Sequence, residues 1–327
     1  MPESFLITGG QGFIGAWVAR RLLAEDAPFA ILDRSPDDGI LAQVISSGDL
    51  PRLHRFYGDI SDPAFVEGVL KKYEATRIIH LAGLQIPACR ADPVAGARVN
   101  VLGTINVFEA AHRSGRVTGI AYASSAAVAG EPADYASPIA DDAPHVPRTH
   151  YGVFKAANEG NARVYFLEHG LSSIGLRPLV VYGAGREIGI SSGPTKAVKA
   201  AVLGRPYTIG FTGVTGFSYA DDVAAVFIAC ARARADGALS LNLRGETARV
   251  DRFIAAIEAE IPGARGAIRA AGPPLPVAYD FRETGLEKLL GNRGIPLTPI
   301  ERGVRETVEI FRRLQREGKL PARDLDT

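Results

Sequence analysis

Short apolar runs alternate with longer segments of helical periodicity through the first part of the chain. Such runs are typical of buried strands, whereas apolar residues repeated every three or four positions are typical of helices. The pattern predicts strands at about 5–7, 29–32, 54–57, 77–81, 118–123 and 173–177, and helices from 13 and at 63–72, 93–114 and 151–169. This alternation predicts an α/β fold with a parallel, doubly wound sheet, whose ligands bind beyond the carboxyl ends of the strands.

The alternation becomes irregular after residue 180. A Gly/Ser-rich loop runs to 194, and the pattern then predicts a helix at 195–203, extended segments at 207–209 and 216–219, a helix from 221, a strand ending at 243 and a last helix at 299–317. We therefore expect a main domain at 1–180, to which the chain returns at about 210–245 to add further elements. The remaining residues, 181–327, form a smaller, mainly C-terminal lobe that closes over the ligand.

A glycine-rich segment joins the first strand to the first helix, with the sequence Thr8-Gly9-Gly10-Gln11-Gly12-Phe13-Ile14-Gly15. Glycines let the backbone approach a ligand closely, and the N–H groups at a helix start, with the positive end of the helix dipole, can bind a pyrophosphate. A tight turn would explain the glycines alone. Their place between a strand and a helix favours a dinucleotide site.

Asp33 ends the second expected strand. A carboxylate at this point can accept both ribose hydroxyls of an adenosine and repels a 2′-phosphate, which favours NAD over NADP. Arg34 follows it and could pair with a 2′-phosphate. A loop-opening turn residue is the alternative explanation of Asp33, but the order of strand, glycine loop, helix and strand favours binding.

Charge and cysteine content exclude several classes of protein. The chain has 37 basic and 36 acidic residues and a net charge of +1, which gives no reason to expect a nucleic acid or a membrane surface as partner. Cys89 and Cys230 have no cysteine neighbours, and the six histidines lack metal-binding spacing, so we expect no metal. A first strand that begins by Ser4 leaves no room for a signal peptide, and no apolar run approaches the ~20 residues of a membrane span, so we expect a cytoplasmic protein.

Three side chains suggest chemistry. Tyr151 and Lys155 are four residues apart, on one face of an expected helix, and Ser125 follows the fifth strand. Lys155 can hydrogen-bond a nicotinamide ribose and, through its charge, lower the pKa of Tyr151 so that the phenol acts as a base. Ser125 would hold the substrate oxygen. Taken singly, the pair fits a solvated helix and Ser125 fits a turn, but their combined placement favours catalysis.

An ordered set of motifs resembles the NAD-dependent epimerase/dehydratase family of the extended short-chain dehydrogenase/reductases, over about residues 4–230. The resemblance rests on 8–15, Asp33, Gly58-Asp59-Ile60, Asn100 within 99–104, 123–128, Tyr151–Lys155 and 177–183. It implies a Rossmann fold that holds NAD tightly, with Tyr151 as acid/base, Ser125 as polariser, and Lys155 holding the ribose and tuning Tyr151. The cofactor would contact Gly9, Gly12, Phe13, Ile14, Gly15, Asp33, Asp59, Ile60, Leu81, Ala82, Gly83, Asn100, Tyr151 and Lys155.

The resemblance also bears on partners and on plainer roles. Dimers of the family commonly pack through the helices expected here at 93–114 and 151–169, which implies a homodimer. The alternatives are a helix-surface amide for Asn100 and a simple turn residue for Asp59, and the resemblance favours the cofactor roles over both.

The family includes epimerases, dehydratases and dehydrogenases, and this sequence departs from some of them. Dehydratases resembling it carry acids where Ala126 and Ala127 stand, which argues against dehydration. Nucleotide-sugar members usually carry an arginine for the diphosphate in the stretch that corresponds to 214–222, which has none, and a tyrosine where Ala129 stands.

Other polar residues are offered to a substrate. Arg186 could pair with a carboxylate or phosphate, Ser191 and Ser192 could bind hydroxyls, and Gln85 lies just past the fourth strand. Solvated loop positions would explain Arg186 and Gln85 as well.

These observations lead to three hypotheses. The first is an NAD-dependent sugar epimerase of the nucleotide-sugar type, which oxidises a carbinol carbon transiently. The second is an NAD-dependent dehydrogenase of a smaller sugar, sugar acid or hydroxy acid. The third is an NAD-binding regulatory protein, against which the intact Ser125, Tyr151 and Lys155 argue.

Overall fold

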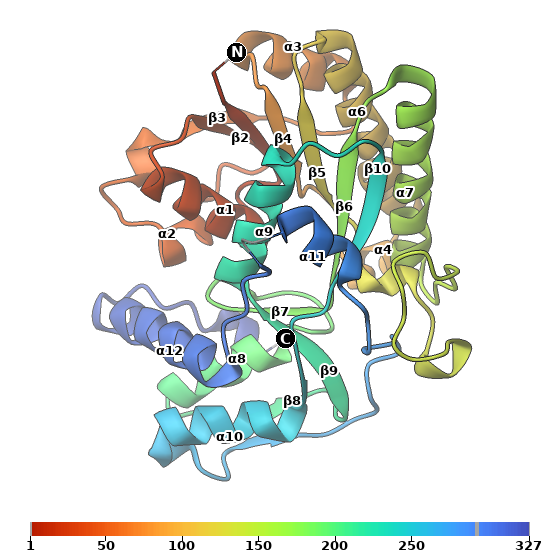
Figure 1. The fold of residues 1–327 in the computed structure, drawn as a ribbon. Helices are drawn as coiled ribbons and strands as arrows, with labels where there is room; N and C mark the ends of the chain where they lie inside the picture. Colours follow the sequence, from red (N-terminus) through yellow and green to blue (C-terminus); the bar gives the residue numbers. More distant parts are fainter. Residues whose placement is uncertain (1, 292–293, 327) are drawn as a thin grey trace.

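The computed structural model describes residues 2–291 and 294–326, and its main element is a seven-stranded parallel sheet (Figure 1). The strand order is β3-β2-β1-β4-β5-β6-β10. The strands are β1 (Phe5–Thr8), β2 (Phe29–Asp33), β3 (His54–Tyr57), β4 (Arg77–His80), β5 (Gly119–Ala123), β6 (Ser173–Pro178) and β10 (Ala238–Leu243). The order reverses direction between β1 and β4, which confirms the predicted doubly wound sheet and marks where a ligand binds in such folds.

Helices cover both faces of this sheet. α1 (Phe13–Ala24) and α9 (Ala220–Arg232) pack together on one face, and α3 (Pro63–Tyr73), α6 (Gly103–Ser114) and α7 (His150–His169) cover the other. Phe5 and Ile7 of β1 are buried in the hydrophobic core beneath α1 and α9, and Leu6 is buried in the core beneath α3 and α6. Because both faces are buried, the strands read as continuous apolar runs.

The predicted helix at 93–114 is divided in the structure. α4 (Ile86–Ala91) and α5 (Pro93–Ala97) precede a π-helical turn, Arg98–Leu102, which leads directly into α6. π-Turns within helices often occur at functional sites, and this one carries Asn100.

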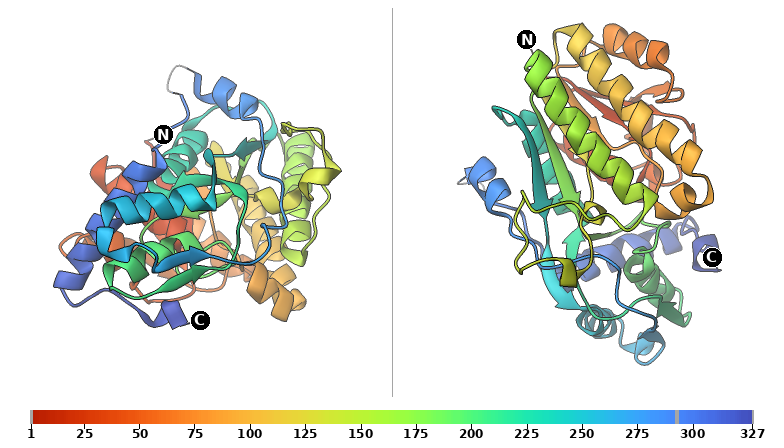
Figure 2. Two further views of the ribbon diagram at one scale, coloured as in Figure 1. Left: turned by 90° about the horizontal axis from the view of Figure 1, so that it is seen from below. Right: turned by 90° about the vertical axis from the view of Figure 1, so that its right-hand side faces the viewer.

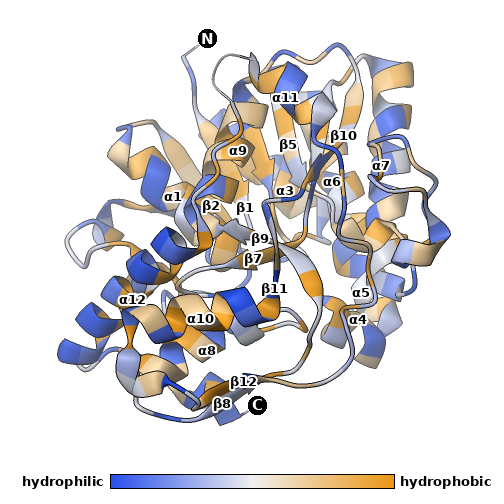
Figure 3. Ribbon diagram, turned by 60° about the horizontal axis from the view of Figure 1, so that its bottom comes forward, coloured by the Kyte–Doolittle hydropathy of each residue, from blue (hydrophilic) through white to orange (hydrophobic). Residues whose placement is uncertain are grey.

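Two smaller sheets and several helices lie beyond the carboxyl ends of the main strands (Figures 1 and 3). One sheet has the order β11-β9-β7 and the other pairs β12 with β8. Figure 3 shows both hydrophobic and hydrophilic positions along α10 and α12. The elements of this region are α2 (Leu41–Val44), β7 (Val180–Tyr182), α8 (Gly193–Val202), β8 (Tyr207–Ile209), β9 (Val214–Tyr219), β11 (Glu246–Arg249), α10 (Val250–Glu260), β12 (Ile268–Ala270) and α12 (Ile300–Arg316). α11 (Thr284–Leu290) instead packs against β10 and α9 of the main domain (Figure 1).

Sequence reasoning did not find β7, β11, β12, α4, α10 or α11. Strands of three or four residues are too short to show a period. Among the residues that the structure describes, no helix is long and apolar enough to cross a membrane, and no group of acidic, histidine or cysteine side chains is arranged to hold a metal ion.

Candidate active site

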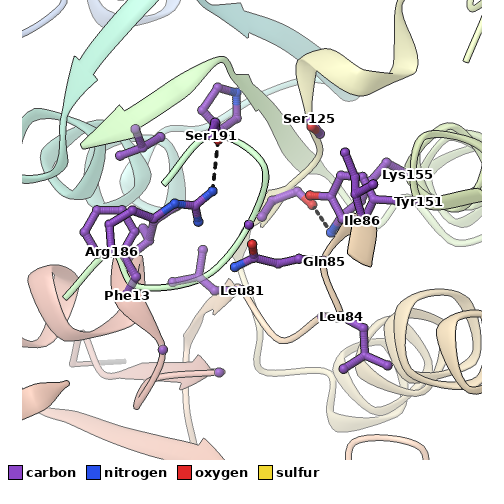
Figure 4. A pocket seen from close by; sticks show the side chains of 18 of the residues that line it. Phe13, Leu81, Leu84, Gln85, Ile86, Ser125, Tyr151, Lys155, Arg186 and Ser191 are labelled. Atoms are coloured by element: carbon purple, nitrogen blue, oxygen red, sulfur yellow. Dashed lines mark hydrogen bonds between the residues drawn. The ribbon is translucent and has the colours of Figure 1, made fainter. Parts of the chain in front are cut away.

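A pocket opens at the carboxyl ends of β1, β4, β5 and β6, where the strand order reverses (Figure 4). It brings together residues that are far apart in the sequence, including most of those predicted to bind cofactor or substrate. Its lining consists of Gly9, Gly12, Phe13, Ile14, Gly15, Leu81, Gly83, Leu84, Gln85, Ile86, Ala123, Ser124, Ser125, Tyr151, Lys155, Pro178, Leu179, Val181, Arg186, Gly189, Ile190 and Ser191.

The glycine loop is shaped by contacts that exclude larger residues. Gly9 has φ +68°, and a Cβ there would lie 2.7 Å from the amide nitrogen of Ala82. A Cβ on Gly15 would lie 2.4 Å from the carbonyl oxygen of Gly9. The first N–H groups of α1, which have no partners within the helix, therefore lie close to the floor of the pocket and suit a pyrophosphate.

The carboxylate of Asp33 is fixed beside this loop. It accepts hydrogen bonds from the backbone N–H of Gln11 at 3.1 Å and of Arg34 at 2.8 Å. An oriented carboxylate next to the glycine loop suits the ribose of an adenosine. The donors and acceptors present thus fit a dinucleotide with one anionic centre and a free ribose diol.

Five predicted cofactor residues lie outside the pocket lining, namely Asp33, Asp59, Ile60, Ala82 and Asn100. Asp59 is exposed, and its carboxylate accepts bonds from the N–H and hydroxyl of Ser61, whereas Ile60 is buried. The backbone of Ala82 packs closely against Gly9 of the glycine loop. The structure therefore leaves the roles of Asp59 and Ile60 beside an adenine as predictions.

Asn100 has a structural position that the sequence did not suggest. It is fully buried; its amide accepts a bond from the Leu84 N–H at 2.7 Å and donates to the Leu84 carbonyl at 3.0 Å. This corrects the surface-amide alternative, whereas the contact of Asn100 with the cofactor stays a prediction. Asn100 holds the segment after β4 that lines the pocket.

β5 and α7 bring Ser125 and Tyr151 together. Ser125 follows β5, and its hydroxyl accepts a bond from the Ala127 N–H at 3.1 Å. Tyr151 lies in the first turn of α7, which Thr149 caps through the Gly152 N–H at 3.0 Å. Burial raises the pKa of Tyr151, while its hydrogen bond with Ser125 and the charge of Arg186 lower it.

Lys155 is buried one turn after Tyr151, where its ammonium donates to the Ala123 carbonyl at 2.6 Å and lies 5.6 Å from the Tyr151 ring centre. Burial lowers its pKa to about 8. We expected Lys155 to lower the pKa of Tyr151. In the structure the pKa of Tyr151 is raised instead, because desolvation outweighs the effects that lower it. The nearby positive charge that lowers this pKa belongs to Arg186.

Arg186 enters the pocket from the loop between β7 and α8 (Figure 4). Its guanidinium lies over the Phe13 ring at 5.6 Å and donates to the Ser191 hydroxyl at 3.2 Å. With its amide oriented to satisfy both of its polar atoms, Gln85 accepts from Arg186 at 3.3 Å and donates to the Ile188 carbonyl at 3.1 Å. No Asp or Glu in the described part of the chain forms an ion pair with Arg186.

The neighbouring Ser192 is not part of the pocket lining. It is buried, and its hydroxyl donates to the Gly189 carbonyl at 2.8 Å. Ser191 is part of the lining, and the backbone N–H of Ser192 donates to the Gly189 carbonyl at 3.1 Å. The contacts of both serines with a substrate stay predictions.

Sequence reasoning missed a buried ion cluster behind the pocket. Glu159 accepts two bonds from Arg177, at 2.8 and 2.6 Å, lies 3.1 Å from His145, and also bonds the hydroxyl of Ser124. Burial opposes ionisation of Glu159, but Arg177 and His145 hold its pKa down at about 2. The sequence signal that could have indicated this cluster is the position of Glu159 four residues after Lys155, on the same face of the helix.

A second, mainly apolar cavity continues from Ser125 away from the glycine loop. Its lining includes Ala126, Ala127, Ala129, Leu179, Leu275 and Val277. No Asp or Glu side chain lines this cavity or the main pocket in the described residues. Ala126 and Ala127 both lie in this lining beside Ser125, and the expectation that the protein does not eliminate water from its substrate stays a prediction.

Comparison with known proteins identifies the family. Residues 5–242 match the model of the NAD dependent epimerase/dehydratase family. The chain belongs to this family. It is therefore an NAD-dependent epimerase or dehydrogenase with a Rossmann-like fold, as the resemblance implied, and NAD is its cofactor.

The relatives span both activities. The chain is 29% identical to a UDP-glucose 4-epimerase of Mycolicibacterium smegmatis over 316 residues, 94% of this chain and 98% of the relative. It is 29% identical to the D-erythronate dehydrogenase of Haemophilus influenzae over 157 residues, 47% of each chain. The Thermus thermophilus UDP-glucose 4-epimerase, solved in complex with NAD, superposes with a TM-score of 0.77 at 26% identity, covering 94% of this chain and 99% of that one.

Proposed function

We propose that the protein is an NAD-dependent sugar epimerase of the nucleotide-sugar type. The observation that carries this proposal is the meeting of Ser125 and Tyr151 at the pocket reached by the glycine loop, with buried Lys155 one turn away. The full-length similarity to a UDP-glucose 4-epimerase supports the sugar-nucleotide substrate.

The chain's own residues supply the proton chemistry. NAD, when bound, takes a hydride from the carbinol carbon and can return it. Ser125 orients the hydroxyl of the substrate, and Tyr151 removes its proton as the carbon is oxidised and returns it when the carbon is reduced. Lys155 supplies a positive charge and a donor next to Tyr151, where a ribose hydroxyl would lie. Epimerisation then needs only that the ketone turns before hydride returns.

A dehydrogenase of a smaller sugar acid or hydroxy acid is the second candidate. The observation that favours it is Arg186, which lies near enough to Tyr151 to influence its pKa and has no acidic partner in the described residues. A guanidinium so placed suits a carboxylate close to the reacting carbon. The absence of arginine from 214–222 points the same way.

Product analysis with NAD separates these candidates. We would incubate the protein with NAD and either UDP-sugars or sugar acids, following NADH absorbance and separating the products by chromatography. Conversion of a UDP-sugar to its epimer without net NADH supports the epimerase. Stoichiometric NADH with an acid supports the dehydrogenase, and no conversion of either class contradicts both and leaves the NAD-binding regulatory protein.

The variant Tyr151→Phe tests the mechanism in either case. We expect kcat to fall by about 10²–10⁴-fold, the usual contribution of a general acid–base, with NAD binding retained. Tyr165→Phe is the matched control, because it makes the same change on the same helix, where the phenol bonds Glu109 instead. Wild-type turnover by Tyr151→Phe would contradict the acid/base assignment.

We further propose a homodimer that forms through α6 and α7. These helices lie side by side on one outer face (Figure 2, right). Val153, Val164 and Leu167 of α7 are exposed there, as is Leu102, at the end of the π-turn that leads into α6. Cys89 and Cys230 are both buried and neither forms a disulfide, which supports a reducing, cytoplasmic setting as our proposal.

A further inference from the structure

The loop that carries Arg186 is connected to the C-terminal end of the chain through a buried lysine. Lys199 of α8 is fully buried; its ammonium lies 2.8 Å from Asp324, in the 3₁₀ turn Arg323–Asp326, and 3.5 Å from Glu187. Glu187 directly follows Arg186. One cation therefore joins the loop that lines the pocket to the last turn of the described chain.

Other contacts place Glu187 at the centre of this connection. Its carboxylate accepts a bond from the Gln43 side chain at 2.8 Å. The backbone carbonyl of Gln43 accepts in turn from Arg313 of α12 at 2.9 Å. Glu187 is thus contacted by Gln43 of α2 and by Lys199 of α8, and α2 is in turn bonded to α12.

The loop combines a fixed start with an exposed middle, whose side chains contact one another, Gln85 and Phe13. Its start is anchored by a bond from the Trp17 indole to the Ala184 carbonyl at 2.9 Å. After that point Ile188 and Ile190 are 67% and 45% exposed. The backbone at Gly185 and Gly189 has positive φ, which gives the loop little intrinsic preference for one conformation.

We propose that the C-terminal turn is a strut that positions Arg186 for the anionic group of the substrate, acting through Lys199 and Glu187. Asp324 fixes the ammonium of Lys199, Lys199 and Gln43 fix Glu187, and Glu187 fixes the backbone from which Arg186 reaches into the pocket. Asp324, Lys199 and Glu187 are positioning residues, since none of them lines the pocket. This inference rests on the proposed function insofar as Arg186 meets a substrate anion.

A double variant removes the Lys199–Asp324 ion pair and leaves Glu187 with the Gln43 side chain as its donor. In the double variant Lys199→Met/Asp324→Leu, apolar side chains of similar length replace the buried ion pair, an exchange that is often neutral or stabilising. Glu187→Gln is the second variant, because it keeps an acceptor for Gln43 and removes the charge that faces Lys199. Asp326→Asn is the control: it lies in the same turn, but its partner Arg205 is exposed.

Two measurements report on the loop whether or not the substrate is known. In hydrogen–deuterium exchange, we expect amides at 185–192 to exchange about tenfold faster or more in both test variants, the change that corresponds to loss of one bond to a charged group. Trp17 is the only tryptophan in the sequence, so the emission comes from one indole, and that indole donates to the Ala184 carbonyl at the start of the loop. We expect that emission to shift in both test variants and to stay unchanged in Asp326→Asn.

Kinetics then test the consequence for the substrate. With a substrate found by product analysis, we expect KM to rise by about tenfold with kcat and NAD affinity retained, as for loss of binding alone. A wild-type exchange rate at 185–192 with wild-type Trp17 emission in both test variants would overturn the strut. Faster exchange in a protein that converts no sugar or acid would leave the strut standing and overturn the proposed function.

Discussion

Lys155 is a buried cation whose ammonium donates to one backbone carbonyl, and the stability of the protein should depend on pH because of it. Burial lowers its pKa from the usual 10.5 to about 8. Between these two values the unfolded chain binds more protons at this residue than the folded protein does. The free energy of unfolding that Lys155 contributes therefore rises as pH increases from about 8 to about 10.5, and the cost of the buried charge is fully present below about pH 8.

We expect the wild-type protein to gain stability relative to Lys155→Met when pH is raised from about 7.5 to about 10, by up to about 3 kcal/mol. Urea unfolding of both proteins at each pH measures this difference. Methionine keeps the length of the side chain and cannot titrate, so other groups cancel in the comparison. A difference that stays constant across this range would show that Lys155 does not change charge in the folded protein.

At the residue scale, the sequence predicts side chains whose position follows from a regular element. Ser125 follows a strand, and Tyr151 and Lys155 share a helical face, so all three could be placed in one pocket. The contact of Gln85 with Arg186 depends on the path of an irregular loop, which no period reveals. The effect of burial on Tyr151 likewise depends on surroundings that the sequence does not show.

At the element scale, the strand–loop–helix unit of β1 and α1 depends on Gly15 for close packing. A Cβ there would lie 2.4 Å from the Gly9 carbonyl oxygen and 2.6 Å from the Gly10 Cα, and both are backbone atoms that cannot move aside. We expect Gly15→Ala to distort the loop and to weaken NAD binding by about tenfold or more. Isothermal titration with NAD measures the effect.

Gly68 provides the matched control within α3. A Cβ at this glycine would meet nothing within 4 Å, and its backbone is helical. We expect Gly68→Ala to leave NAD binding unchanged and to stabilise the fold by about 0.5–1 kcal/mol, the difference in helix propensity between glycine and alanine. Equal NAD affinity in the two variants would contradict the role given to Gly15.

Helices and strands of the main sheet were predictable because each buries a face or both faces over several residues. The 93–114 segment was predicted as one helix, since its apolar spacing does not reveal the π-turn. That turn is stabilised by bonds specific to this fold: Asn158 donates to the Asn100 carbonyl at 2.8 Å, and the Thr104 hydroxyl donates to it at 2.7 Å. Such tertiary bonds between distant segments leave no periodic trace in the sequence.

At the scale of the whole molecule, one outer face remains apolar where α6 and α7 lie together. Val153, Val164 and Leu167 occupy one side of α7, since eleven residues make three helical turns, and Leu102 is exposed near the start of α6. These exposed apolar side chains would be covered if two copies of the chain packed together through this face, as we propose. A two-fold axis would place the same residues on both sides of the interface.

We expect the wild-type protein to be a dimer and Leu167→Glu to dissociate it. Leu167 is 66% exposed in the single chain, so glutamate there should not disturb folding, but in a dimer it would place an unpaired carboxylate in an apolar interface. We expect the dimer Kd to rise by about 100-fold or more, and sedimentation velocity over a range of concentrations measures it. Leu297→Glu makes the same change at another exposed leucine, outside α6 and α7, and should leave the dimer intact. A dimer that persists in Leu167→Glu would place the interface on another face. A monomeric wild-type protein would contradict the proposed dimer.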